Sequence, residues 1–275
     1  MNLEVGGDGG AWREVGALLG LGWPVCAAVM GALWWRQTRT KDATSVDVAW
    51  SALLGLLALL YAVLSSGEPA RRIAIAVMVA SATWRLAWHL YTDRARGGVE
   101  DGRYANLRRE WGDSAQSKFF LFFQAQALLD VLLSLPFALA CVSPGPLGAL
   151  DFAAIALWCV SLVGEGVADA QLAAFKRDSA NRGRTCRVGL WRYSRHPNYF
   201  FQWCLWIAYA MLGLGAPWGV LGLLAPLVML GLILFVTGIP PTEAQALRSR
   251  GDDYRDYQRT TSAFVPWFPA QVKRT

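Results

Sequence analysis

The sequence predicts an all-α membrane protein, built as a bundle of about seven transmembrane helices. Hydrophobic residues make up 55% of the 275 residues and charged residues only 17%, so the chain has more apolar surface than a soluble core of this length would bury. Several uncharged runs reach the length of one bilayer crossing, about 20 residues. Fourteen tryptophans suit the bilayer interface, where an apolar ring with one polar N–H is favourable.

The runs define the expected helices in chain order. They are residues 17–35, 48–67, 73–91, 119–142 and 152–171, followed by two helices within the uncharged tract 197–242. That tract is long enough to cross a bilayer of about 30 Å twice. Gly215, Ala216 and Pro217 supply the turn between its halves.

Basic residues alternate from loop to loop, which predicts the orientation. Of the 26 lysines and arginines, 22 lie in four segments, residues 36–45, 92–118, 172–198 and 240–275. Only Arg13, Arg71 and Arg72 lie in the opposite segments, and Arg85 lies inside a helix. Since basic loops stay on the cytoplasmic side, we expect the N-terminus outside and the C-terminus in the cytoplasm.

Polar side chains inside the predicted helices are costly unless they are paired or line a wet cavity. There are five of them: Arg85, His89, Asp130, Glu165 and Asp169. We expect them to converge with Asp47 and Gln202 on one water-accessible cavity, in which His89 donates a proton because its pKa lies near neutrality. Structural ion pairs of Arg85 with Asp130 or Asp47, and a purely structural His89, are the alternatives.

The stretch KRDSANRGRTCRVGLWRYSRHPNYF, residues 176–200, alternates cations with small polar and aromatic residues. Arginine forks pair with phosphate oxygens, and aromatic faces stack on a base, so the stretch favours a polyanionic, ring-bearing ligand. The same cations would also serve membrane topology and anionic headgroups. No glycine-rich dinucleotide fingerprint follows a predicted strand, and two histidines cannot form a His-based metal cluster, so we expect no metal site.

The carboxyl tail carries a third pattern, PPTEAQALRSRGDDYRDYQRTTSAFVPWFP, residues 240–269. A capping box from Thr242 to Gln245 predicts the start of a short helix over 242–250. Tyr254 and Tyr257 are spaced to share one side of a turn, and three aromatic or apolar side chains crowd residues 265–268. We interpret this tail as a lid over the cytoplasmic opening of the bundle, beside the stretch 176–200.

Residues 151–269 resemble the C-terminal region of the steroid 5α-reductase superfamily, and most closely its bacterial membrane proteins with a DUF1295 domain. The motifs that carry the resemblance are GLWRYSRHPNYFFQW, GDDYRDYQRTTSAFVPWF and, upstream, WRLAWHLYTDRAR. The resemblance implies one membrane domain over residues 1–275, in a bacterial inner membrane. It also implies an enzyme that binds NADPH and reduces a C=C bond conjugated to a carbonyl in a lipid-like substrate.

The same resemblance implies site residues. Cofactor contacts are expected at Arg85, Arg94, Arg96, Asp169, Lys176, Arg195, His196, Asn198, Tyr199, Trp206, Tyr254 and Tyr257. Catalytic roles are expected for His89, Asp47 and Gln202. Gln202 stands where the steroid enzymes have a glutamate, and Ala82 where they have a tyrosine. The resemblance therefore leaves a steroid, another enone or a polyprenoid open as the substrate.

Isoprenylcysteine carboxyl methyltransferases are similar in the same places. SRHPNY, TEAQAL and DYRDY fit their pattern, which implies S-adenosylmethionine as the alternative cofactor and a lipid-borne methyl acceptor. A non-enzymatic lipid-binding protein is the third possibility. We expect membrane lipid as surroundings, no nucleic acid partner and no obligatory protein partner.

Overall fold

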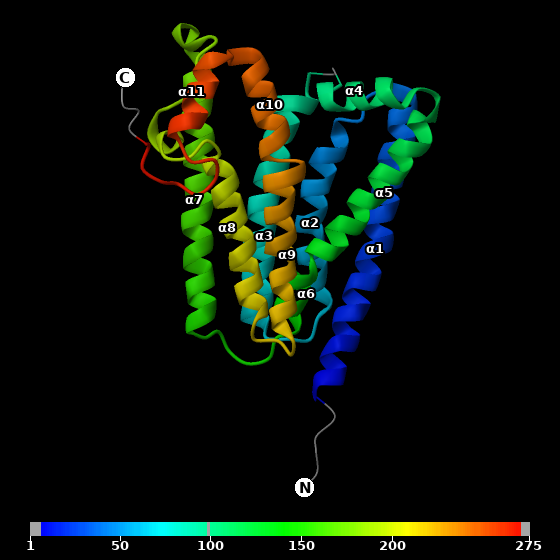
Figure 1. Ribbon diagram of the computed structural model, residues 1–275. Coiled ribbons are helices and arrows are strands. Elements are labelled where there is room, and N and C mark those ends of the chain that lie inside the picture. The colour runs from blue at the N-terminus through cyan, green and yellow to red at the C-terminus, as the bar shows by residue number, and fades with distance from the viewer. Residues whose placement is uncertain (1–6, 98–99, 271–275) are drawn as a thin grey trace. The chain divides into compact units, whose positions relative to one another are not determined.

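The computed structural model describes residues 7–97 and 100–270, and within these ranges every regular element is helical (Figure 1). The chain divides into two compact units. The first comprises residues 1–152 and 209–225, and the second comprises residues 153–208 and 226–275. Helices α7, α8 and α9 each contribute to both units.

Among the described residues, six α-helices lie wholly within the first unit. They are α1 (Gly7–Thr40), α2 (Ser45–Leu64), α3 (Pro69–Leu90), α4 (Gly102–Trp111), α5 (Ala115–Leu133) and α6 (Leu135–Val142). The π-helical turn η1 (Tyr91–Ala95) extends α3, the 3-10 turn η2 (Gly112–Ser114) joins α4 to α5, and η5 (Gly219–Leu223) also belongs to this unit.

Local chemistry explains several helix ends of the first unit. Pro69 opens α3 and Pro136 lies in the first turn of α6, where a fixed φ and a missing N–H cost nothing. The Asp101 side chain caps α4 by accepting a hydrogen bond from the Arg103 amide, 2.9 Å away. Gly112 ends α4 at a φ of +50°, a conformation that glycine adopts without strain.

Helix α2 packs against α3, and α1 packs against α5. Their shared core contains large side chains that are almost wholly buried: Met30, Leu54, Leu57, Ile75, Phe119, Phe123, Leu133, Phe137 and Leu139. The polar helix α4 is fixed by ion pairs. Arg103 contacts Asp47 of α2 at 2.6 Å, and Arg108 contacts Glu100 at 2.7 Å.

The second unit contains most of α7 (Ala149–Arg177) and α8 (Pro197–Gly213), with the 3-10 turns η3 (Ser179–Asn181) and η4 (Gly189–Arg192) between them. It continues with the end of α9 (Leu224–Gly231), the π-helical η6 (Leu232–Val236), α10 (Ile239–Arg250) and α11 (Asp252–Thr260). The Phe201 ring of α8 lies directly over Gly164 of α7. A Cβ at residue 164 would lie 2.5 Å from that ring, so glycine permits this close approach.

The start of α10 differs from the predicted capping box. The helix begins at Ile239 and takes both Pro240 and Pro241 into its first turn. The Thr242 hydroxyl donates backwards to the Gly238 carbonyl, 2.8 Å away, instead of capping an amide. The two prolines explain the difference, because their fixed φ suits a first turn and places the helix start three residues earlier.

Six helical stretches among the described residues are long and apolar enough to cross a membrane: Gly9–Thr40, Ser45–Leu64, Pro69–Asp93, Gly102–Val142, Ala149–Arg177 and Gly219–Arg250. This confirms an all-α, multi-pass membrane protein. The prediction of about seven crossings differs by one helix. The remaining expected crossing is α8, which has only 17 residues.

Candidate functional site

A loop of the second unit is fixed onto α7 just before α8 begins. Gly189 has a φ of +56°, and a Cβ there would lie 2.3 Å from the Gln171 side chain. The Gln171 amide oxygen accepts a hydrogen bond from the Leu190 amide at 2.8 Å. The indole Nε1 of Trp191 donates to the Ala168 carbonyl, also at 2.8 Å. These contacts set the position of the Ser194–Arg195–His196 sequence that follows.

The tail after α11 pairs with this loop by backbone contacts. The Arg195 amide donates to the Ser262 carbonyl at 2.8 Å, and the Ser194 hydroxyl donates to the Phe264 carbonyl at 2.8 Å. Tyr257 is buried, and its hydroxyl contacts the carbonyl oxygens of Trp191 and Ser194. The loop and the tail therefore form one fixed wall.

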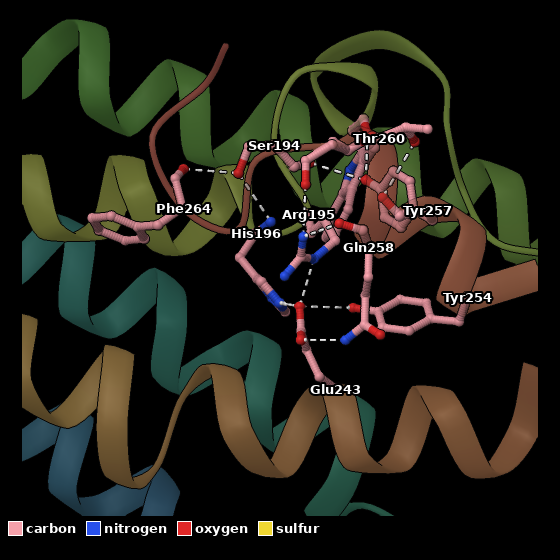
Figure 2. A network of polar contacts seen from close by, with 11 residues as sticks. Ser194, Arg195, His196, Glu243, Tyr254, Tyr257, Gln258, Thr260 and Phe264 are labelled. Carbon is pink, nitrogen blue, oxygen red and sulfur yellow. Dashed lines mark hydrogen bonds and ion pairs between the residues drawn. The ribbon is translucent and has the colours of Figure 1, made fainter. Parts of the chain in front are cut away.

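Glu243 of α10 is the centre on which this wall converges (Figure 2). Its Oε1 lies 2.7 Å from Arg195 Nε, 3.2 Å from His196 Nε2 and 3.3 Å from the Tyr254 hydroxyl. Its Oε2 accepts a hydrogen bond from Gln258 Nε2 at 2.6 Å. The sequence motifs around residues 195, 243 and 254 thus meet at one carboxylate, which we call the Glu243 centre.

The arginine of the Glu243 centre is held from two sides. Besides Glu243, Arg195 donates through one terminal nitrogen to the carbonyls of Thr261 at 2.6 Å and Gln258 at 3.1 Å. A partly buried guanidinium with a carboxylate and two carbonyl acceptors is well compensated. Arg195 therefore has a structural role, because it joins the loop before α8 to α10 and to the end of α11.

The protonation states of His196 and Tyr254, the two other titratable groups at Glu243, follow from their surroundings. Burial lowers the pKa of His196, and this outweighs the opposing effect of Glu243, so the ring is neutral near pH 7. Because an ionised carboxylate only accepts hydrogen bonds, His196 Nε2 carries the proton and Nδ1 keeps a lone pair. Burial and the nearby Glu243 raise the pKa of Tyr254, so its hydroxyl stays protonated and donates.

A basic pocket of about 250 Å³ lies at the end of α7, where the loop after it meets α10. Small polar and apolar residues line it together with four cations, which are Lys176, Arg182, Arg184 and Arg250. No carboxylate lines the pocket, and none of the four cations forms an ion pair within the described part of the chain. Arg250 lies over the ring of Tyr254, 5.5 Å from its centre, so the basic pocket borders the Glu243 centre.

The structure places most of the sequence-predicted cofactor residues in the second unit. Asn198 of α8 donates to Asp169 of α7 at 3.1 Å, and the rings of Tyr199 and His196 stack at 5.4 Å. Trp206 is buried on α8, and Gln202 is partly buried one turn before it. Lys176 lines the basic pocket, while Arg195, His196 and Tyr254 meet at Glu243.

The other predicted residues belong to the first unit. His89 and Arg96 are exposed, Arg85 is partly buried, and the side chain of Arg94 lies outside the described residues. Asp47 accepts hydrogen bonds from Arg103 at 2.6 Å and from the Tyr104 hydroxyl at 2.5 Å.

The alternative ion pair between Arg85 and Asp130 is not formed. Asp130 is wholly buried on α5, and neither of its carboxyl oxygens has a hydrogen-bond partner among the described residues. Asp130 is also separate from Asp47, which belongs to the network of α4. The structure therefore does not join these two acids in one polar cluster, as the predicted convergence would require.

Glu243 and Gln258 were not among the predicted site residues. The signal for Glu243 was present, because it is the first charge after the uncharged tract 197–242. The predicted lid is found in part. Thr261 and Phe264 are buried beside the Glu243 centre, whereas Val265, Trp267 and Phe268 are exposed.

Comparison with known proteins identifies the family. The profile described as "Protein of unknown function (DUF1295)" matches residues 33–261, so the chain belongs to this family. The match begins well before the predicted region 151–269. The chain is also similar to "Uncharacterized protein C594.04c" of Schizosaccharomyces pombe, with 26% identity over 261 residues that cover 85% of this chain and 75% of the relative. No solved structure matches the chain significantly.

Proposed function

We propose that this DUF1295 protein is a membrane-embedded reductase that uses NADPH to reduce a C=C bond conjugated to a carbonyl in a lipid-like substrate. The resemblance to the steroid 5α-reductase superfamily motivates the reaction. The observation that carries the choice of cofactor is the basic pocket, with four cations and no carboxylate.

The charge of the basic pocket suits NADPH better than S-adenosylmethionine. NADPH carries a pyrophosphate and a 2′-phosphate, whereas S-adenosylmethionine carries one carboxylate, one ammonium and one sulfonium. Arginine forks bind phosphate oxygens in pairs, and a partly enclosed site strengthens each contact. A pocket with four unneutralised cations would repel a ligand that has two positive groups of its own.

The residues present also fit the rest of such a cofactor. Leu172 and Phe175 add apolar surface to the basic pocket, and Asn181 is held there by its bond to the Phe175 carbonyl at 3.1 Å. When bound, NADPH would supply the hydride for the reduction. In this proposal Lys176, Arg182, Arg184 and Arg250 bind its phosphates, and Arg195 and Glu243 hold the wall beside them.

We propose His89 as the proton donor, because an imidazole is the side chain that most often serves as a general acid in enzymes. Glu243 suits that role poorly. Its two oxygens already face four donor groups, so a proton on either oxygen would break existing hydrogen bonds. We therefore assign Glu243 to positioning.

A methyltransferase is the second candidate, and one specific observation favours it. The three motifs that resemble the isoprenylcysteine carboxyl methyltransferases meet at Glu243 through Arg195, His196 and Tyr254. A single carboxylate beside a basic wall is also compatible with a zwitterionic ligand. The two candidates therefore differ in which ligand the protein retains.

The test is ligand binding by the detergent-purified protein, measured by calorimetry with NADPH, NADH and S-adenosylmethionine. We expect NADPH to bind most tightly. Arg250→Ala should weaken NADPH binding roughly tenfold to a hundredfold, the effect of losing about 1.5–3 kcal/mol from a charge-assisted contact. Arg248→Ala is the matched control, because this residue is exposed on the same helix and does not line the basic pocket.

The ligand that binds distinguishes a reductase, a methyltransferase and a non-enzymatic lipid-binding protein. Tight binding of S-adenosylmethionine without NADPH would overturn the reductase and favour the methyltransferase. Binding of neither, together with only lipid found by mass spectrometry of the purified protein, would favour a non-enzymatic lipid-binding protein.

A further inference from the structure

The tail of the second unit exposes large apolar side chains at fixed positions. Val265 is 52% exposed, Trp267 70% and Phe268 77%, although Phe264 just before them is buried against Phe200 and Trp203. Three such side chains within four residues form an apolar patch whose exposure to water is unfavourable. We call residues 265–268 the aromatic tail.

The aromatic tail is attached firmly to the loop before α8. The Trp267 amide donates to the Tyr193 carbonyl at 2.8 Å, and the Phe268 ring meets the Tyr193 ring edge-to-face at 5.9 Å. The Ser194 hydroxyl holds the Phe264 carbonyl at 2.8 Å. The exposed side chains of the aromatic tail therefore lie beside residues 193–194 of the loop.

The exposed residues of α7 indicate where this loop lies along the bilayer normal. The loop is bonded to α7 at Ala168 and Gln171. Before this point the exposed face of α7 is apolar, with Val160, Val163 and Val167. After it the exposed face becomes charged at Lys176 and Arg177. The apolar belt of α7 thus ends at the level where the loop and the aromatic tail are attached.

We propose that the aromatic tail embeds in the lipid interface, in the leaflet at the basic end of α7. Its partner is phospholipid at the boundary between headgroups and acyl chains, where Trp and other aromatic rings are favoured. The exposed Arg192 on the same loop faces the lipid phosphates. This membrane anchor holds the wall of the Glu243 centre through Tyr193, Ser194 and Arg195, and it does not depend on which cofactor the protein uses.

The experiment measures the depth of a spin label on the full chain in phosphatidylcholine–phosphatidylglycerol nanodiscs. The background is Cys159→Ser, because Cys159 is the exposed cysteine and the other four are buried. Trp267→Cys carries the label in one variant and Phe268→Cys in a second, in case one of them fails to fold. Ser179→Cys is the matched aqueous control, since this residue is exposed beyond the last turn of α7.

We expect the label at 267 or 268 to collide several-fold more with oxygen and several-fold less with a water-soluble nickel chelate than the label at 179. Equal accessibility to the nickel chelate at both sites would show a tail in water and overturn the proposal. Protection from both reagents would show a tail covered by protein, either another part of this chain or a second copy, and would overturn it as well.

Discussion

At the scale of single residues, Glu243 contributes more to the second unit than its place directly after an uncharged tract suggests. Arg195, His196, Tyr254 and Gln258 approach its two oxygens from the loop and from α11. A partly buried carboxylate is well tolerated when its hydrogen-bonding capacity is filled, as it is for Glu243. Glu243 thereby joins three segments that are distant in sequence.

Replacing Glu243 tests this role. Glu243→Gln keeps the shape but removes the charge and leaves Arg195 without its anionic partner. Because the pair is partly buried, we expect a loss of about 3 kcal/mol, the lower end of the range for broken buried pairs. Thermal unfolding in detergent measures the loss as a lower Tm. Asp252→Asn is the control, because that carboxylate is exposed on α11 and its loss should cost little. Equal melting of the two variants would contradict the role of Glu243.

His196 makes the stability depend on pH near neutrality. Its pKa in the folded protein is lowered from the ordinary value of 6.5, chiefly by burial. Below pH 6.5 the unfolded chain therefore binds more protons than the folded chain, and stability falls until the pH passes the folded pKa. We expect Tm to decrease from pH 7 towards pH 5. The decrease should be smaller in His196→Gln, and an unchanged pH profile in that variant would argue against a buried neutral histidine.

At the scale of elements, the sequence predicted the long helices well because their apolar runs match the bilayer thickness. It predicted the start of α10 wrongly because Pro240 and Pro241 outcompete the capping box at Thr242. It also merged α5 and α6, which the structure separates at Ser134. Breaks of this kind depend on local backbone choices that the apolar pattern does not record.

Gly189 is the element-scale position with the strictest requirement. Alanine there would adopt an unfavourable φ of +56° and place its Cβ 2.3 Å from Gln171. We expect Gly189→Ala to lower stability by more than about 1–2 kcal/mol, the cost of the backbone conformation alone. Gly166→Ala is the control, since it lies inside α7 with open space around it and should be neutral or stabilising. Comparable Tm values for the two variants would contradict the constraint.

At the scale of the whole molecule, sequence reasoning predicted the class of the protein and much of the wall around Glu243. The motifs at residues 195–199 and 254–257 are local and can be recognised in the sequence. The basic pocket could be predicted only in part, because the end of α7 and residues 181–184 are joined there by Arg250 of α10. Lys176, Arg182 and Arg184 lie in the basic stretch 176–200 that the sequence singled out, whereas Arg250 is distant in sequence and joins them only through the packing of α10.

The topology of the chain depends on whether α8 crosses the membrane. With 17 residues, α8 is about 26 Å long, slightly short of a hydrocarbon core of about 30 Å, a mismatch that local thinning can accommodate. If α8 crosses, seven spans place the ends of the chain on opposite sides, whereas six spans would place them on the same side. The charge pattern favours seven, because 22 of the 26 basic residues lie on one predicted side.

The first unit strengthens this prediction, because two of the three cations on the opposite side, Arg71 and Arg72, are bound within the fold. Arg71 is buried in an ion pair with Asp151 at 2.8 Å and also donates to the Gly145 carbonyl, while Arg72 donates to the Ala62 carbonyl at 2.8 Å. We therefore expect a reporter fused after residue 275 to be cytoplasmic, and a reporter inserted in the loop 143–148 to be outside. Fusions before residue 7 should also report outside. If reporters at both ends of the chain lay on one side, α8 would not cross and the orientation would have to be assigned from six spans.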